Sequence, residues 1–311
     1  MGLGGFWPIW LLFGCESTTS PDDGHGLTGE LAYVRSSSSM EDYEVALMDL
    51  RNGKRRVWSV GDSAIGHLAW HPVTGELYGS ESATTSGPLR ISSFELQAGK
   101  DLATVSKIVD EPGRTSFGLT FEPDGTRIAY HSYGPGARAV TLMTRTLASG
   151  ESTEIPCGYN ACAQPDWHPD GTHLVFVADK KRVVERNLET GEQRELYKTP
   201  WNEDAVGPKY SPDGESLVLV KGDFGRSAVS QSTDLLRIPR DGGDAEVLRH
   251  VEDGRLSDAT WIDSNHVVVG RSSTKTRTYR LMLYDLEDGS EQALSLDSVF
   301  AYGPAYKPPA P

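Results

Sequence analysis

Short apolar runs, each bounded by turn-forming residues, dominate the pattern of hydrophobic and polar positions along this chain. The clearest runs are Leu31–Val34, His173–Val177, Leu217–Val220 and His266–Val269, and Gly, Pro, Asp or Ser residues flank them. No stretch sustains apolar positions at the 3.6-residue period of a helix. Because short apolar runs between turn signals are typical of β-strands, the pattern predicts an all-β protein.

A turn motif recurs along the chain: an aromatic residue, one variable residue and usually Pro, often followed by Asp-Gly. Pro presets φ for a tight turn, Asp can accept hydrogen bonds from backbone N–H groups within the turn, and Gly supplies a positive φ. A strand follows the motif, so the motif is expected to be the hairpin between the first two strands of a repeat. Its copies begin at Trp70, Phe121, Trp167, Tyr210, Trp261 and Tyr306, the copy at Trp261 being degenerate.

The spacing of these copies predicts the architecture. The six aromatic positions are 51, 46, 43, 51 and 45 residues apart, a period that matches one four-stranded propeller blade. Gly29–Val34 looks like a second strand without a first, and Gly303–Tyr306 looks like a first strand with nothing after it. We therefore expect a six-bladed β-propeller of four-stranded antiparallel blades, closed by pairing N- and C-terminal strands in one blade.

The repeat resembles that of TolB-like propellers. Trp167–Phe176 (Trp-His-Pro-Asp-Gly-Thr-His-Leu-Val-Phe) and Tyr210–Leu219 (Tyr-Ser-Pro-Asp-Gly-Glu-Ser-Leu-Val-Leu) look like that family's WD-like repeat, and the resemblance extends from about Gly29 to Pro308. It implies a periplasmic propeller that binds other proteins of the bacterial cell envelope. Similar blades also occur beside peptidase domains and in a few lyases, so the resemblance is specific for the fold and much less so for the function.

The N-terminus predicts export. Met1–Gly14 is uncharged and rich in large apolar side chains, too short to span a bilayer but suitable for a signal peptide. It ends in Leu12-Phe13-Gly14-Cys15, which resembles the lipobox of bacterial lipoproteins, and this resemblance makes Cys15 the lipidated residue; an ordinary cysteine is the alternative. We expect a signal segment at residues 1–15, a flexible tether at 16–28 and one propeller domain at 29–311, anchored by lipid in the periplasm or at the outer membrane.

Two further cysteines, Cys157 and Cys162, lie just before a strand. An oxidising compartment would let them form a disulfide, which we favour over free thiols and over zinc, because no second Cys/His pair with suitable spacing completes a four-ligand site. His67 and His131 are expected near the channel, but two imidazoles from different blades fall short of a metal site. We expect no metal and no cofactor.

The charge balance limits the partners. There are 44 acidic and 30 basic residues, which give a formal net charge of −14, and the acidic residues are scattered along the chain. Such a surface repels phosphate backbones, so nucleic acid is excluded and membrane contact is expected only through the lipid anchor. Gly24–Gly29 matches G-x-G-x-x-G but precedes a strand, and no G-x-S-x-G motif is present. We expect a monomer without catalytic activity.

Loops on a rigid scaffold are the usual place of binding, so the rim opposite the turn motifs is the expected binding surface. Its exposed aromatic and acidic residues suit an envelope protein or peptide of basic character. Packing between blades is the alternative for Trp201 and Phe300. A metal-assisted lyase, or a propeller that binds a sugar acid in its central channel, is the alternative function. The candidate binding residues are Phe117, Tyr159, Gln164, Trp201, Glu203, Asp204, Asp258, Phe300 and Tyr302.

Overall fold

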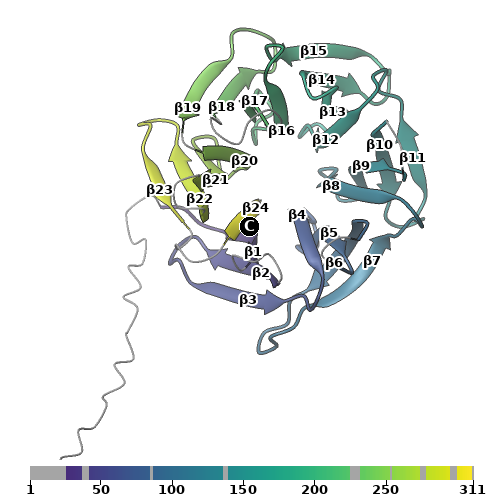
Figure 1. Ribbon diagram of the computed structural model, residues 1–311, viewed down its shortest axis with the longest axis vertical. Coiled ribbons are helices and arrows are strands. Elements are labelled where there is room, and N and C mark those ends of the chain that lie inside the picture. Colours follow the sequence, from purple (N-terminus) through teal and green to yellow (C-terminus); the bar gives the residue numbers. More distant parts are fainter. Residues whose placement is uncertain are drawn as a thin grey trace, which may run out of the picture.

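The computed structural model describes residues 26–36, 42–84, 87–135, 139–224, 232–252, 254–273, 278–294 and 300–309. The expected signal segment, Cys15 and most of the tether lie outside these residues. Within them the structure has strands and no helix, and so no helix that could cross a membrane. The 24 strands form six four-stranded antiparallel sheets arranged as blades around a central axis (Figure 1). The predicted all-β, six-bladed fold is confirmed.

Five blades follow the chain in order, each from an innermost to an outermost strand. The strands of the first two are β4 (Ala64–Trp70), β5 (Leu77–Ser82), β6 (Arg90–Glu95) and β7 (Thr104–Val109), then β8 (Thr115–Phe121), β9 (Arg127–Tyr133), β10 (Thr141–Thr146) and β11 (Ser152–Ile155). The next is β12 (Cys162–Trp167), β13 (His173–Ala178), β14 (Arg182–Asn187) and β15 (Gln193–Lys198). The last two are β16 (Asp204–Tyr210), β17 (Ser216–Gly222), β18 (Thr233–Pro239) and β19 (Glu246–Val251), then β20 (Gly254–Trp261), β21 (His266–Ser273), β22 (Thr278–Asp285) and β23 (Glu291–Ala293).

The sixth blade joins both ends of the described chain. Its innermost strand is β24 (Phe300–Lys307), followed by β1 (Glu30–Ser36), β2 (Tyr43–Asp49) and β3 (Arg55–Ser59). β24 and β1 pair antiparallel, from Glu30 opposite Lys307 to Ser36 opposite Phe300. The strand that each end lacks is therefore supplied by the other, as the sequence predicted, and the ring closes without an unpaired innermost strand.

The core is divided among the blade interfaces. Six apolar clusters of buried residues each lie between two neighbouring blades. In one of them Leu142 of β10 packs with Trp167 and Phe176 of the next blade. Because a blade is covered on both faces, its second strand is buried on both faces, as in β13 and β17. This explains why these strands appear in the sequence as continuous apolar runs instead of alternating ones.

The turn motifs lie together at one end of the channel, which we call the turn rim; the other end is the far rim. Asp124, Asp170 and Asp213 each accept a hydrogen bond from the backbone N–H two residues further on, at 2.7–3.0 Å. Gly125 and Gly214 have φ near +77°. These residues shape the hairpins, as the motif predicted.

Every innermost strand carries a register shift at an equivalent place, just before its motif aromatic residue. Gly118, Gln164, Gly207 and Gly303, each three residues before that aromatic residue, have positive φ there. A Cβ on Gly118 would lie 2.4 Å from Cε1 of His131. The bulges interrupt the regular alternation of the innermost strands at residues that line the central channel.

Candidate functional site

A cavity of about 350 Å³ occupies the channel between the bulges and the turn rim. All six innermost strands contribute to its wall. Toward the rim it is lined by motif aromatic residues and by the prolines of four turns, Pro72, Pro123, Pro169 and Pro212. This combination of apolar walls with a few polar groups at the base is typical of a binding site.

The polar groups of the cavity come from two positions of the repeat. Three residues before the aromatic residue stand His67, Gly118, Gln164, Gly207, Asp258 and Gly303, and one residue before it stand Ala69, Thr120, Asp166, Lys209, Thr260 and Ala305. Glycine and alanine occupy five of these positions and leave room, while the other seven carry polar side chains, four of them ionisable. We call His67, Asp166, Lys209 and Asp258 the channel floor.

The channel floor consists of two ion pairs. Nε2 of His67 (β4) lies 3.1 Å from Oδ1 of Asp258 (β20), so this pair joins two blades that are not neighbours in the ring. Nζ of Lys209 (β16) donates to Oδ1 of Asp166 (β12) at 2.9 Å. The carboxylate of Asp166 also accepts hydrogen bonds from Thr120 Oγ1 at 3.1 Å and from the Tyr210 backbone N–H at 3.0 Å. The His67–Asp258 pair therefore bridges the channel, whereas the Lys209–Asp166 pair joins the inner strands of two neighbouring blades.

Both members of the His67–Asp258 pair have shifted pKa values. Burial opposes the charged imidazolium, but the charge of Asp258 and its hydrogen bond outweigh this effect and raise the pKa of His67 above 6.5. Burial likewise opposes the carboxylate of Asp258, yet the charge and hydrogen bond of His67 and the charge of Lys209 hold its pKa below the usual value. Each group therefore favours the charged form of the other.

His131 has a different role from His67. It is 2% exposed, its ring centroid lies 3.7 Å from that of Phe117, and the Gln164 N–H donates to its Nδ1 at 3.3 Å. Burial, with the charge of His67, lowers its pKa to about 3. His131 is thus a neutral residue that packs behind the cavity wall.

Of the nine candidate binding residues, two line the cavity: Gln164 and Asp258. Oε1 of Gln164 accepts the Gly207 N–H at 3.0 Å. Trp201 stands on the far rim with 78% of its surface exposed, so it does not pack between blades. Phe300 does contact a neighbouring blade, with its ring centroid 4.9 Å from that of Tyr279.

The remaining candidates have structural partners. Glu203 pairs at 3.0 Å with Lys221, which also pairs with Asp234 at 2.9 Å, and Asp204 pairs with Lys181 at 2.7 Å. Phe117 packs on His131, Tyr159 packs partly buried against an apolar cluster, and the Tyr302 hydroxyl donates to the Ile65 carbonyl at 2.9 Å. The structure therefore places the polar cavity at the turn rim, away from most of the predicted residues.

Asp166 and Lys209 were not among the predicted site residues. The signal that could have found them is the alternation of a strand counted backward from the motif aromatic residue. The aromatic residue and the residue two before it belong to the core, as Leu119 and Phe121 do. The residues one and three before it then face the channel.

His168, Asp170 and His173 form the one group of described residues whose ligand atoms lie close enough together for a metal ion. Oδ2 of Asp170 is 2.9 Å from Nδ1 of His168 and 2.8 Å from Nδ1 of His173. Nε2 of His168 faces the Arg240 guanidinium at 2.8 Å, and Nε2 of His173 faces the Asn187 amide nitrogen at 3.2 Å. Nδ1 of His173 donates to Asp170, whereas Nδ1 of His168 accepts the Asp170 backbone N–H at 3.0 Å, and the group forms a hydrogen-bond network at a turn.

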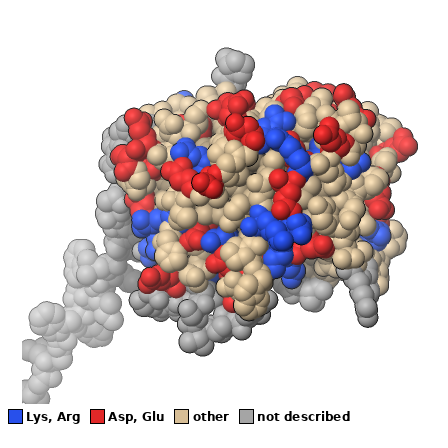
Figure 2. All heavy atoms as spheres, turned by 90° about the horizontal axis from the view of Figure 1, so that it is seen from above, with Lys and Arg blue, Asp and Glu red and all other residues tan. Residues whose placement is uncertain are grey.

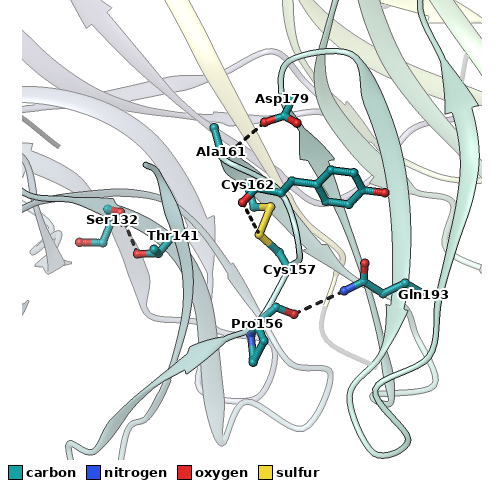
Figure 3. Close-up of a disulfide and its surroundings, with 9 residues drawn as sticks. Ser132, Thr141, Pro156, Cys157, Ala161, Cys162, Asp179 and Gln193 are labelled. Atoms are coloured by element: carbon teal, nitrogen blue, oxygen red, sulfur yellow. Dashed lines mark hydrogen bonds between the residues drawn. A yellow bond between two sulfur atoms is a disulfide. The ribbon is translucent and has the colours of Figure 1, made fainter. Parts of the chain in front are cut away.

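The two cysteines that the sequence paired, Cys157 and Cys162, are joined by a disulfide between β11 and β12 (Figure 3). The surrounding loop is held by the Ala161 N–H, which donates to Asp179 at 3.1 Å, and by Gln193, which donates to the Pro156 carbonyl at 3.4 Å. The disulfide fixes the chain just before it enters the channel wall.

The outer wall of the molecule carries mixed charge. In the edge-on view of Figure 2, acidic and basic side chains are interspersed. Ion pairs on outer strands include Arg237–Glu246 at 2.6 Å within one blade and Arg249–Glu291 at 2.8 Å between two blades. On the side seen in Figure 2 the net negative charge is therefore not gathered into one patch that would mark a binding surface.

Comparison with known proteins finds the same fold in solved structures and does not establish the function. No family model matches the chain. Over 107 residues it is 29% identical to the "Uncharacterized peptidase YuxL" of Bacillus subtilis (strain 168), a match that covers 32% of this chain and 16% of that protein. The chain thus matches about a sixth of this relative's length.

Solved structures share the propeller. TolB from Acinetobacter baumannii aligns with a TM-score of 0.63 and 16% identity, over 89% of this chain and 66% of that one. A putative TolB from Agrobacterium tumefaciens gives 0.61 and 16%, over 90% and 99%. An oligogalacturonate lyase from Vibrio parahaemolyticus gives 0.54 and 11%, over 85% and 78%, and Kuenenia stuttgartiensis hydrazine synthase gives 0.71 and 11%, over 90% and 47%. At such identities these likenesses show a shared six-bladed fold with structural neighbours among TolB proteins, and the fold alone.

Proposed function

We propose that this chain is a non-catalytic interaction propeller of the bacterial cell envelope, and that the channel cavity at the turn rim binds a segment of its partner. The observation that carries the proposal is the cavity itself: about 350 Å³, with aromatic and proline walls and charged groups confined to the floor. Apolar walls give affinity and a few polar groups give orientation. The structural neighbours among TolB proteins support the same function.

The proposed location follows from the N-terminal sequence. Residues 1–15 would direct export, and a lipid on Cys15 would hold the monomeric propeller in the periplasm or at the outer membrane through the tether. The disulfide between Cys157 and Cys162 supports an oxidising compartment. The partner is then another envelope protein, with the basic character that suits a chain of net charge −14.

The alternative is a metal-assisted lyase or a sugar-acid binder that uses the same channel. It is favoured by His67 on the cavity wall and by the Vibrio parahaemolyticus lyase among the structural neighbours. Dialysis against a chelator, followed by metal analysis, separates the two functions. A stoichiometric metal that survives dialysis favours the enzyme.

The direct test is a pull-down from detergent-solubilised envelope with three forms of the protein. Thr260→Phe fills the cavity from its wall, and Trp201→Ala removes the exposed aromatic residue of the far rim. We expect a partner that the wild type and Trp201→Ala retain and that Thr260→Phe loses. The reverse pattern would place binding on the far rim, and no specific partner for the wild type would contradict the interaction function.

A further inference from the structure

The channel floor brings four ionisable side chains together from four different blades. His67, Asp166, Lys209 and Asp258 all line the cavity, and the side chains of His67 and Asp258 keep 32% and 25% of their surface exposed within it. A group that enters from the turn rim can therefore reach both members of this pair. Lys209 is already matched by Asp166 at 2.9 Å.

The sign of the floor's charge decides what it can bind. Lys209 and Asp166 cancel, so the net charge depends on His67 beside Asp258. With His67 protonated the floor is neutral, and with His67 neutral it carries one negative charge. It has no state of net positive charge while both carboxylates are ionised, so a cation is favoured over an anion.

No other group near the pair changes this count. The groups that act on His67 are Asp258 from β20, Lys209 from β16 and His131 from β9. His131 stays neutral because burial lowers its pKa to about 3. The charge of Asp258 also acts on Tyr302, whose pKa is raised above its ordinary value of 10.0, mainly by burial. Of this set, His67 is the group whose ordinary pKa, about 6.5, lies nearest neutral pH.

We propose that the channel floor is a site for an ammonium or guanidinium group of the partner, which takes the place of the His67 proton beside Asp258. The carboxylate that now accepts from His67 Nε2 at 3.1 Å would accept from the incoming N–H groups instead. Binding then releases the proton of His67 to solvent, and the floor keeps the same net charge. This inference rests on the proposed function, because it names the chemistry that the bound segment carries.

The exchange makes binding depend on pH in one direction. Protons and the cationic group compete for the same carboxylate, so affinity should rise by up to about tenfold per pH unit below the pKa of His67 and level off above it. An anionic ligand would show the opposite dependence. Because the pKa of His67 is raised, the transition lies above pH 6.5.

The test uses the full-length protein and two capped tripeptides, Gly-Arg-Gly and its neutral counterpart Gly-Gln-Gly, with affinity followed by NMR between about pH 5 and pH 9. We expect the arginine peptide to bind more tightly as pH rises and the glutamine peptide to bind at least tenfold more weakly at high pH. Asp258→Asn should abolish this preference. His67→Gln should keep the binding of the arginine peptide and remove its pH dependence.

Several results would overturn the proposal: no binding of the arginine peptide at any pH, equal binding of both peptides, tighter binding toward acid, or wild-type behaviour in Asp258→Asn. Asp258→Asn is nearly isosteric, and thermal unfolding checks that both variants fold. If the pull-down yields a partner lost in Thr260→Phe while the peptides show no such preference, the proposed function stands and the cation site fails. If no partner is captured, the proposed function itself fails.

Discussion

His67 and Asp258 are joined across the channel, and their shifted pKa values make the stability of the protein depend on pH. The raised pKa of His67 contributes stability that is fully present below its unfolded pKa, about 6.5, and is lost as pH rises through the folded value. The lowered pKa of Asp258 contributes stability present above about 3.8 and lost as pH falls through the folded value. The pair is therefore most stabilising between about pH 4 and pH 6.5.

Asp258→Asn should remove this dependence. We expect the difference in free energy of unfolding between wild type and Asp258→Asn to be largest near pH 5–6 and to shrink toward pH 9, because His67 then loses its charge in the wild type as well. Urea unfolding of both proteins across this range measures the difference. A difference that stays constant from pH 5 to pH 9 would mean that the pair does not titrate as described.

At the scale of the element, the bulges of the innermost strands position the cavity wall. A glycine at a bulge can be required for two reasons: the backbone has a positive φ, or a neighbouring side chain leaves no space for a Cβ. Gly118 combines both, since φ is +65° and a Cβ would lie 2.4 Å from the ring of His131. Gly99 has a positive φ of +76° with nothing within 4 Å of a Cβ, and therefore isolates the first reason.

Gly118→Ala should lower the free energy of unfolding by about 3 kcal/mol or more, whereas Gly99→Ala should cost only the about 1–2 kcal/mol of a left-handed alanine. The excess comes from the displacement of His131, which is 2% exposed and held between Phe117 and Gln164. Denaturant unfolding of the two variants gives the comparison. Equal losses would show that the bulge tolerates a side chain.

The disulfide also positions an innermost strand. Cys157 and Cys162 close a loop with a sequence separation of five, and the chain-entropy relation gives about 2 kcal/mol for a loop of this size. The double variant Cys157→Ala/Cys162→Ala should therefore unfold with a free energy about 2 kcal/mol lower but keep the same β-sheet circular dichroism spectrum. An unchanged free energy would show that the hydrogen bonds of Ala161 and Gln193 suffice to hold the loop.

The strands and turns were predictable from the sequence where a residue type strongly favours one backbone conformation. The Pro-Asp-Gly turns were predictable because each residue has one favoured place in the hairpin, and their spacing then gave the blades. The bulges were not, because Gly118, Gln164 and Asp258 share a position in the repeat but no side-chain property. The ion-pair partners of Glu203 and Asp204 were not predictable either, because Lys221 and Lys181 come close to them only when the blades fold.

The stability of the whole molecule depends on closure of the ring by the pairing of β24 with β1. β24 contributes to both blade interfaces of the closing sheet, through Ala305 on one side and Ala301 on the other. It also supplies the Ala305 carbonyl to the indole of Trp70 at 3.1 Å. Without β24, the paired edge of β1 and the flanks of both neighbouring blades would be exposed.

A chain ended after Leu294 should therefore lose cooperative unfolding. The expected result is a broad thermal transition and association in size-exclusion chromatography, because the ring cannot close and β1 offers an unpaired edge. Calorimetry of the truncated and full-length proteins makes the comparison. A single sharp transition at the wild-type temperature would contradict closure by the C-terminal strand.

Photo-crosslinking shows whether a partner enters the channel from the turn rim. A photoreactive phenylalanine at Pro212, an exposed residue at the cavity mouth, is compared in intact envelope with the same group at Trp201 on the far rim. We expect one discrete protein adduct from position 212, lost when Thr260→Phe fills the cavity, and none from position 201. An adduct from position 201 with none from position 212 would contradict entry from the turn rim.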